Sequence, residues 1–122
     1  MRQILVRNLS RSQSRPVKAP YCISFICRLR GLTFRRNLAE DEGLLLVQGS
    51  DSRLDASIHM LFVWMDLAVV WINSAGNVVD VRLARRWHLA YAPQRPARYV
   101  LETLPTRLDE FRVGDRIEFE DI

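Results

Sequence analysis

The stretch from Ser57 to Asn73, SIHMLFVWMDLAVVWIN, is the most apolar part of this chain of 122 residues and constrains its fold most strongly. No apolar run reaches the roughly 18 to 20 residues that span a bilayer, so we expect no membrane segment. Many of its residues are β-branched or aromatic, which favours strands over a helix. We therefore predict two strands that divide near Met65-Asp66 and fold back on each other.

Short apolar segments separated by turn residues occupy the rest of the chain, as is typical of all-β domains. Residues 73–77 have the composition of a hairpin loop, with Gly76 at the left-handed position. Pro16 and Pro20 bracket a segment suited to a sheet edge, because proline cannot donate to a ladder. Other strands are expected at Gln3–Val6, Leu44–Val47, Val78–Leu83, Tyr99–Thr103 and Ile117–Phe119, and surface turns at 49–52, 108–111 and 113–116.

One helix is predicted near residues 22–34, where apolar residues recur at spacings of three and four. The expected fold is therefore mainly β with an α+β tendency. It is a distorted β-sandwich or barrel, jelly-roll-like, of about eight short strands with one short helix. We see no linker or repeat, so residues 1–122 are expected to form a single domain.

The charges of the chain are distributed unevenly. Nine basic residues and no acidic residue precede Glu40, whereas seven acidic residues and three arginines follow from Glu102 onward. Such asymmetry can mark a nucleic-acid face. We favour the alternative that the two ends of the chain pack side by side and neutralise each other, because the termini of a domain often lie close together.

The two cysteines, Cys22 and Cys27, are five residues apart within the expected helix. Two helical residues at that spacing point to different sides, so we predict buried thiols that are not bridged. The N-terminal sequence has no apolar core typical of a secretory signal, which predicts a cytoplasmic protein. Phosphate-loop, dinucleotide and zinc-protease motifs are absent from the sequence, and we expect no cofactor and no metal.

Several short motifs follow one another in the order found in a known family. GLTFR at 31–35 resembles a G-L-M-x-R motif, EDEGLLL at 40–46 resembles D-E-G-M-L-F, and IHMLF at 58–62 resembles a W-M motif in its histidine variant. ARYVLETL at 97–104 resembles A-x-x-V-L-E-L. Over residues 17–120 the chain thus resembles the domain-of-unknown-function family 192 (DUF192). The resemblance implies a compact β domain and brings no established activity.

One polar cluster is the candidate site. His59 lies within an apolar run, where a buried imidazole needs a partner that Asp66 can supply. Arg35 can pair with Asp66 or bind a carboxylate or phosphate, and Glu42 is a further member of the cluster. The opposing interpretation is a structural His–Asp–Arg network that fixes strand register. We expect no catalytic residue and treat these four residues as ligand-binding.

From this cluster we predict a non-enzymatic binding or accessory domain with a small polar pocket for an anionic ligand. One alternative is a small hydrolase that uses His59 as a base oriented by Asp66. The second alternative is a nucleic-acid-binding domain that acts through an Arg-rich face. It would require exposed aromatic residues among the arginines near 85–98, on one face with the basic N-terminal half. We treat nucleic acid as the less favoured partner because Trp64, Trp71 and Trp87 are expected in the core. The domain is expected to act away from membranes, as a monomer or weak homodimer.

Overall fold

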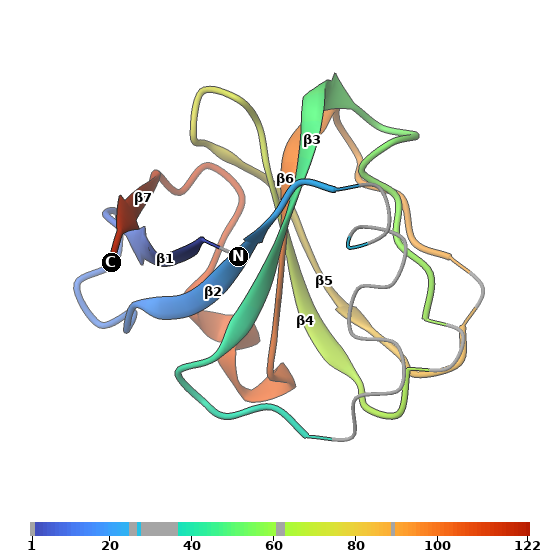
Figure 1. Cartoon of the computed structure of the whole chain (residues 1–122), viewed down its shortest axis with the longest axis horizontal. Coiled ribbons are helices and arrows are strands. Elements are labelled where there is room, and N and C mark those ends of the chain that lie inside the picture. Colours follow the sequence, from blue (N-terminus) through green and yellow to red (C-terminus); the bar gives the residue numbers. More distant parts are fainter. Residues whose placement is uncertain (1, 25–26, 28–36, 61–62, 89) are drawn as a thin grey trace.

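The computed structural model describes residues 2–24, 27, 37–60, 63–88 and 90–122. These residues form seven strands in one strongly curled sheet, shown in Figure 1. The strand order is β5-β4-β6-β3-β2-β1-β7. The bounds are Gln3–Asn8 for β1, Val17–Cys22 for β2, Gly43–Ser52 for β3, Leu67–Ile72 for β4, Val78–Ala84 for β5, Ala97–Thr103 for β6 and Ile117–Asp121 for β7. A short 3₁₀ helix, η1, covers Pro105–Glu110.

The sheet is nearly closed into a barrel because its two outer strands meet at one end. The backbone N–H of Val78 at the start of β5 donates to the carbonyl of Asp115 over 2.9 Å, and Ile117 donates to the carbonyl of Gly76 over 2.8 Å. Gly76 has a φ of 88°, so the predicted left-handed glycine of this hairpin is confirmed. The mainly β, distorted barrel architecture predicted from the sequence is confirmed as well.

The two faces of the central strands bury separate apolar clusters. The barrel-side cluster packs β3, β4 and β6 against β1, β2 and β7, and includes Ile4, Val17, Leu45, Val70, Leu101 and Ile117. The loop-side cluster lies on the opposite face beneath segment 53–66, and includes Leu44, Ala56, Met60, Val63, Val69, Trp71 and Val100. Alternation of side chains along β3, β4 and β6 produces both clusters, because successive residues of a strand point to opposite faces.

Trp71 fastens segment 53–66 to the sheet. Its side chain is fully buried, and its indole N–H donates to the carbonyl of Ala56 over 2.8 Å. Figure 1 shows this segment running beside the connection from β5 to β6, on the side of the sheet away from β1 and β7. Backbone hydrogen bonds join the two connections, with Ile58 and Tyr91 bonded in both directions at 2.9 and 2.8 Å.

The first half of the apolar stretch is therefore not the strand that we predicted. Only residues 67–72 form a regular strand, and the described residues between 57 and 66 are irregular apart from the isolated bridge at Ile58. Their backbone groups bond to the neighbouring connection instead of to a sheet ladder, which apolar periodicity cannot reveal. The helix predicted near 22–34 falls mostly outside the described residues.

Two further strand predictions were wrong in detail. The segment bracketed by Pro16 and Pro20 belongs to β2, which lies between β1 and β3 rather than at an edge. Pro20 removes one donor, but the ladder resumes at once because the N–H of Tyr21 donates to the carbonyl of Arg2 over 2.7 Å. The predicted surface turn at 49–52 is the exposed end of β3, which pairs with β6 at Ser52 and Ala97.

Cys22 and Cys27 form a disulfide, which corrects the prediction of two separate thiols. Cys22 ends strand β2 instead of lying in a helix, and the N–H of Cys27 donates to the hydroxyl of Ser24 over 3.1 Å. The resulting turn brings the two Cα atoms to 5.8 Å, within the range that a disulfide requires. The spacing of two residues on one helix does not apply here, because Cys22 belongs to β2.

The two ends of the chain pack together, as the charge distribution predicted. β1 and β7 are antiparallel neighbours, and their side chains form ion pairs. Arg2 lies 3.2 Å from Asp121 and Arg7 lies 2.9 Å from Glu120. Basic residues near the N-terminus are thus partly neutralised within the domain.

Candidate functional site

Two tryptophans that the sequence placed in the core lie at the surface. Trp64 and Trp87 are 40% and 43% exposed, whereas Trp71 is fully buried. Their ring centroids are 5.1 Å apart, and the rings meet edge to face at 85°. Exposed aromatic side chains held in one place are typical of binding surfaces, because one ring supplies a large contact area at low entropic cost.

The backbone around Trp87 is fixed by segment 53–66. The N–H of Trp87 donates to the carbonyl of Met60 over 2.7 Å, and the N–H of Met60 donates to the carbonyl of His88 over 3.0 Å. Met60 itself is fully buried in the loop-side cluster. Trp87 has a φ of 66°, a left-handed conformation that costs a bulky residue about 1–3 kcal/mol. The anchored Met60 maintains this conformation and presents the indole outward.

Asp66 joins the same surface through Arg86. Its Oδ1 accepts from the backbone N–H of Arg86 over 2.9 Å and from Nε of that side chain over 3.3 Å. The backbone hydrogen bond from Arg86, with the positive charges of Arg86 and Arg85, holds the pKa of Asp66 below its usual value. Asp66 therefore stays ionised and orients Arg86, whose side chain is 59% exposed.

We call this area the tryptophan surface, and define it by Trp64, Asp66, Arg85, Arg86, Trp87 and His88. Arg85 and His88 are exposed like Arg86. The N–H of Arg85 donates to the hydroxyl of Tyr91 over 3.0 Å, and the ring of Tyr91 stacks on His88 with centroids 6.0 Å apart. Two arginines against one aspartate leave a positive surface charge beside two exposed indoles.

The four residues predicted as a site are only partly placed by the structure. His59 is half-buried beside Met60, with its Nδ1 enclosed, and Asp66 contributes to the tryptophan surface. Glu42 bonds within its own turn, since its Oε1 accepts from the N–H of Ala39 over 3.1 Å. Arg35 lies outside the described residues. Among the described residues, Arg86 is the arginine that contacts Asp66, and the sequence analysis considered it only as part of the nucleic-acid alternative.

Glu102 is a buried acid that was not among the predicted site residues. It is 4% exposed on β6, directly opposite Leu44 of β3 and Val69 of β4, so its side chain shares the loop-side face with these apolar residues. Among the described residues, Oε1 of Glu102 has no hydrogen-bond partner. Burial raises the pKa of this carboxyl to about 7. The detectable signal in the sequence was one acid inside the apolar strand YVLETL.

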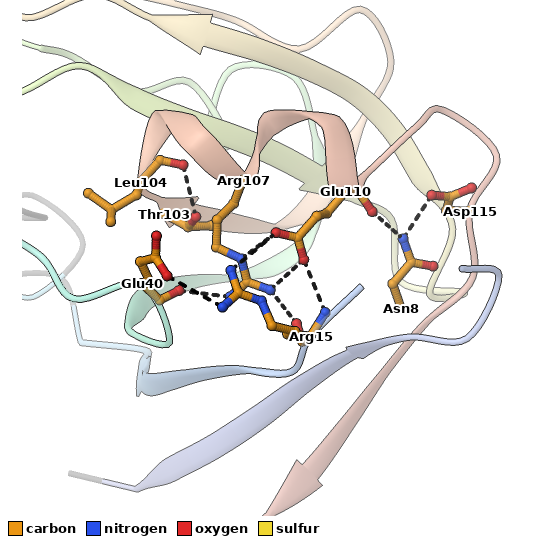
Figure 2. Close-up of polar contacts among 8 residues, drawn as sticks. All are labelled: Asn8, Arg15, Glu40, Thr103, Leu104, Arg107, Glu110 and Asp115. Carbon is orange, nitrogen blue, oxygen red and sulfur yellow. Dashed lines mark hydrogen bonds and ion pairs between the residues drawn. The ribbon is translucent and has the colours of Figure 1, made fainter. Parts of the chain in front are cut away.

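A second polar centre lies around Arg107 and is shown in Figure 2. The guanidinium is fully buried and donates to both carboxylate oxygens of Glu110 over 2.9 and 2.8 Å. It also donates to the carbonyl of Glu40 over 3.0 Å and to that of Arg15. The hydrogen bonds from Arg107 hold the pKa of Glu110 below its usual value. This network ties η1 to two distant loops and serves the fold.

A groove of about 320 Å³ lies between the loop 10–14 and residues 109–112. Two of its charged groups are used within the fold, because Arg11 pairs with Asp115 over 2.8 Å and Glu110 pairs with Arg107, whereas Asp109 and Arg112 are exposed. No three His, Cys, Asp or Glu residues gather as a metal site in the described part of the chain. The described residues also contain no helix long and apolar enough to cross a membrane.

The fold and these surfaces define a small, nearly closed β-barrel domain with a basic aromatic surface on one side. The chain belongs to the DUF192 family, described as "Uncharacterized ACR", whose model matches residues 7–119. Its membership confirms the resemblance found in the sequence motifs.

Similar proteins come from Thermococcus and Pyrococcus species. A UPF0127 protein of Thermococcus gammatolerans is 44% identical over 79 residues, which are 65% of this chain and 50% of that protein. A UPF0127 protein of Pyrococcus furiosus is 32% identical over 115 residues, covering 92% of this chain and 95% of the other. The match thus spans only about half the length of the Thermococcus relative.

Two solved structures share the fold. A protein of Sinorhizobium meliloti, solved as a candidate transcription regulator, superposes with a TM-score of 0.84 at 21% identity and covers 97% of this chain and 92% of its own. A protein of unknown function from Novosphingobium aromaticivorans gives a TM-score of 0.79 at 17% identity, with coverages of 95% and 83%. At these identities the likeness extends to the fold alone.

Proposed function

We propose that this domain is a non-enzymatic binding module that takes an anionic ligand at the tryptophan surface. The observation that carries the proposal is the pair of exposed indoles of Trp64 and Trp87 bordered by Arg85 and Arg86. Arginine forms forked contacts with carboxylate and phosphate groups, and aromatic faces add contact area for the rest of the ligand. His59, beside Met60 at the edge of this surface, stays a predicted ligand contact.

The geometry of Arg86 supports an anion as the ligand. Asp66 engages its Nε and backbone N–H, and the exposed end of the guanidinium extends into solvent. An arginine oriented by one carboxylate can bind a second anion with little further loss of side-chain entropy. Arg85 adds a second positive charge beside it. The surface therefore offers two arginine side chains to a carboxylate or phosphate group.

The hydrolase alternative gains less support from the described residues. The hydroxyl of Ser57, the nearest candidate nucleophile in sequence to His59, donates to the carbonyl of Arg53 over 2.9 Å. Asp66, the predicted orienting group, accepts from Arg86. A general-base mechanism needs the nucleophile and the orienting carboxylate both on the imidazole. We therefore favour binding over catalysis.

The name of the Sinorhizobium protein suggests gene regulation for that protein. Since the likeness to it extends to the fold alone, we base our proposal on the surface residues of this chain. The cytoplasmic location predicted from the sequence stays a prediction. The Cys22–Cys27 disulfide bears on this prediction of location. Disulfides persist mainly in oxidising compartments and in intracellular proteins of hyperthermophiles.

Calorimetric titration with inorganic phosphate and with citrate at low salt tests the proposal. We expect Arg86→Gln to weaken binding about tenfold, the loss of one charge-assisted contact. Arg2→Gln is a matched control, because Arg2 is 57% exposed and its Nε lies 3.2 Å from Asp121, whereas the corresponding values for Arg86 are 59% and 3.3 Å. Equal losses in the two variants would contradict the proposal.

A further inference from the structure

We infer that the anionic ligand of the tryptophan surface is a single-stranded nucleic acid, whose bases stack on Trp64 and Trp87 while its phosphates contact Arg85 and Arg86. This inference rests on the proposed function and narrows its ligand class. From the sequence we predicted that nucleic acid is the less favoured partner, because all three tryptophans were expected in the core. The structure removes that objection for two of them, which are 40% and 43% exposed.

The two indoles are arranged as stacking platforms for more than one base. They meet at 85°, so their faces point in different directions and cannot serve the same flat ligand together. The edge of one ring covers part of one face of the other, so stacking would use the faces that stay exposed. A flexible strand can reach two such faces, because each base has its own aromatic plane and the backbone can turn between them. A compact anion such as phosphate would use the arginines and leave both indoles unused.

The arginines lie where the backbone of such a strand would pass. Arg85 and Arg86 directly precede Trp87 in the chain, and Arg86 is held on Asp66, two residues after Trp64. Each indole therefore has a cationic side chain on a neighbouring position. Single-strand binding surfaces combine these two elements, a basic track for the phosphates and aromatic side chains for the bases.

The surface is also fixed before any ligand arrives. Trp87 is held at a φ of 66° by its bond to the carbonyl of Met60, and Met60 is fully buried. Folding therefore already fixes the backbone of Trp87, and binding does not have to order it. Among its described residues this surface presents no helix that could enter the major groove of a duplex, which favours a single strand over duplex DNA.

Tryptophan fluorescence provides a direct test, because the buried Trp71 is shielded from stacking and serves as an internal reference. We would titrate the whole chain with an oligothymidylate of roughly ten nucleotides, a length typical of single-strand sites. We expect quenching from Trp64 and Trp87. Trp64→Leu and Trp87→Leu should each weaken binding about tenfold. Trp64→Phe and Trp87→Phe keep an aromatic face, so these variants should retain most of the affinity that the Leu variants lose.

Salt dependence separates the phosphate contacts from the stacking contacts. With two phosphates neutralised, the slope of log affinity against log salt should be about −1.4, and Arg86→Gln should reduce its size by about 0.7. The Trp→Leu variants should keep the original slope at lower affinity. Arg2→Gln, whose arginine pairs with Asp121 of β7, should change neither quantity, and circular dichroism would establish that every variant is folded.

The failure of this inference can be told apart from failure of the proposed function. If phosphate or citrate binds in an Arg86-dependent manner but the oligonucleotide binds no more tightly, the ligand is a small anion and the inference is overturned. Oligonucleotide binding that is equal in the wild type and both Trp→Leu variants overturns it as well. Binding of neither class overturns both proposals.

Discussion

Glu102 lies directly opposite Val69 in the register of β6 and β4, so a carboxyl group is enclosed in an apolar face of the barrel. Burial raises its pKa from the ordinary value of 4.5 to about 7. Between these two values the folded chain holds a proton that the unfolded chain releases. The contribution of this group to stability is therefore complete below about pH 4.5 and is lost as the pH rises through 7.

We expect the wild-type domain to lose about 3 kcal/mol of unfolding free energy from this group between pH 5 and pH 8. Glu102→Gln keeps the shape of the side chain but does not titrate. In this variant, position 102 should therefore add no pH dependence to the unfolding free energy across that range. Urea unfolding of both proteins at several pH values gives the difference. Parallel pH profiles for the two proteins would show that Glu102 does not titrate as inferred.

The buried ion pair of Arg107 and Glu110 should contribute far more to stability than an exposed pair of the same length. Removing Arg107 takes a donor from two loop carbonyls and from the Glu110 carboxylate, which still accepts from the backbone N–H of Arg15 over 3.0 Å. We expect Arg107→Ala to cost about 3 kcal/mol. Arg7 and Glu120 offer the control, because their Nε–Oε2 distance is also 2.9 Å while both side chains are exposed.

Arg7→Ala should cost less than about 1 kcal/mol. Chemical denaturation of the two variants measures both values under one condition. Similar losses in the two variants would mean that the Arg107 network does not hold η1 and its two loops together.

Gly43 permits the closest approach of β3 to its neighbours. A Cβ at this position would lie 2.8 Å from the carbonyl oxygen of Glu102 and 2.7 Å from a methyl group of Val17. We expect Gly43→Ala to destabilise the domain by about 1–3 kcal/mol through overpacking. Gly49 on the same strand has no atom within 4 Å of the corresponding position, so Gly49→Ala should be close to neutral. Equal thermal shifts in the two variants would contradict this account.

The disulfide of Cys22 and Cys27 closes a short loop, for which the chain-entropy estimate is about 2 kcal/mol. Reduction of the wild-type protein should therefore lower its unfolding free energy by roughly that amount without unfolding it. Mass spectrometry after alkylation, with and without reductant, establishes the bridge and gives the fraction oxidised. Complete alkylation of the native protein without reductant would exclude the bridge.

The strand segments were predictable where local pattern and tertiary role agree. Residues 78–83 alternate between apolar and polar types, and the structure pairs them in β5 beside β4. The left-handed conformation of Gly76 in the 73–77 turn was equally predictable, because the turn itself requires it. The packing of the two chain ends against each other was predicted from the uneven distribution of charge and from the usual closeness of domain termini.

The surface tryptophans and the disulfide were not predictable in this way. Nothing local distinguishes Trp64 and Trp87 from the buried Trp71, because their exposure depends on two connections that bond to each other instead of to the sheet. Segment 57–64 has strand composition, but its described backbone groups at Ile58 and Met60 bond to Tyr91 and His88 in the connection from β5 to β6. The Cys22–Cys27 bridge depends on where β2 ends, and element boundaries are the least certain part of a sequence pattern.

The pairing of β1 with β7 also affects how the domain folds. Ile4 is matched with Asp121, so the first strand cannot gain its second neighbour until residues 117–121 have left the ribosome. Such distant partners give slow folding, on the order of milliseconds to seconds, because long chain segments must close before their contacts form. During synthesis the nascent β1–β2 hairpin would expose one unpaired side, and this interval is when association with other nascent chains is most dangerous.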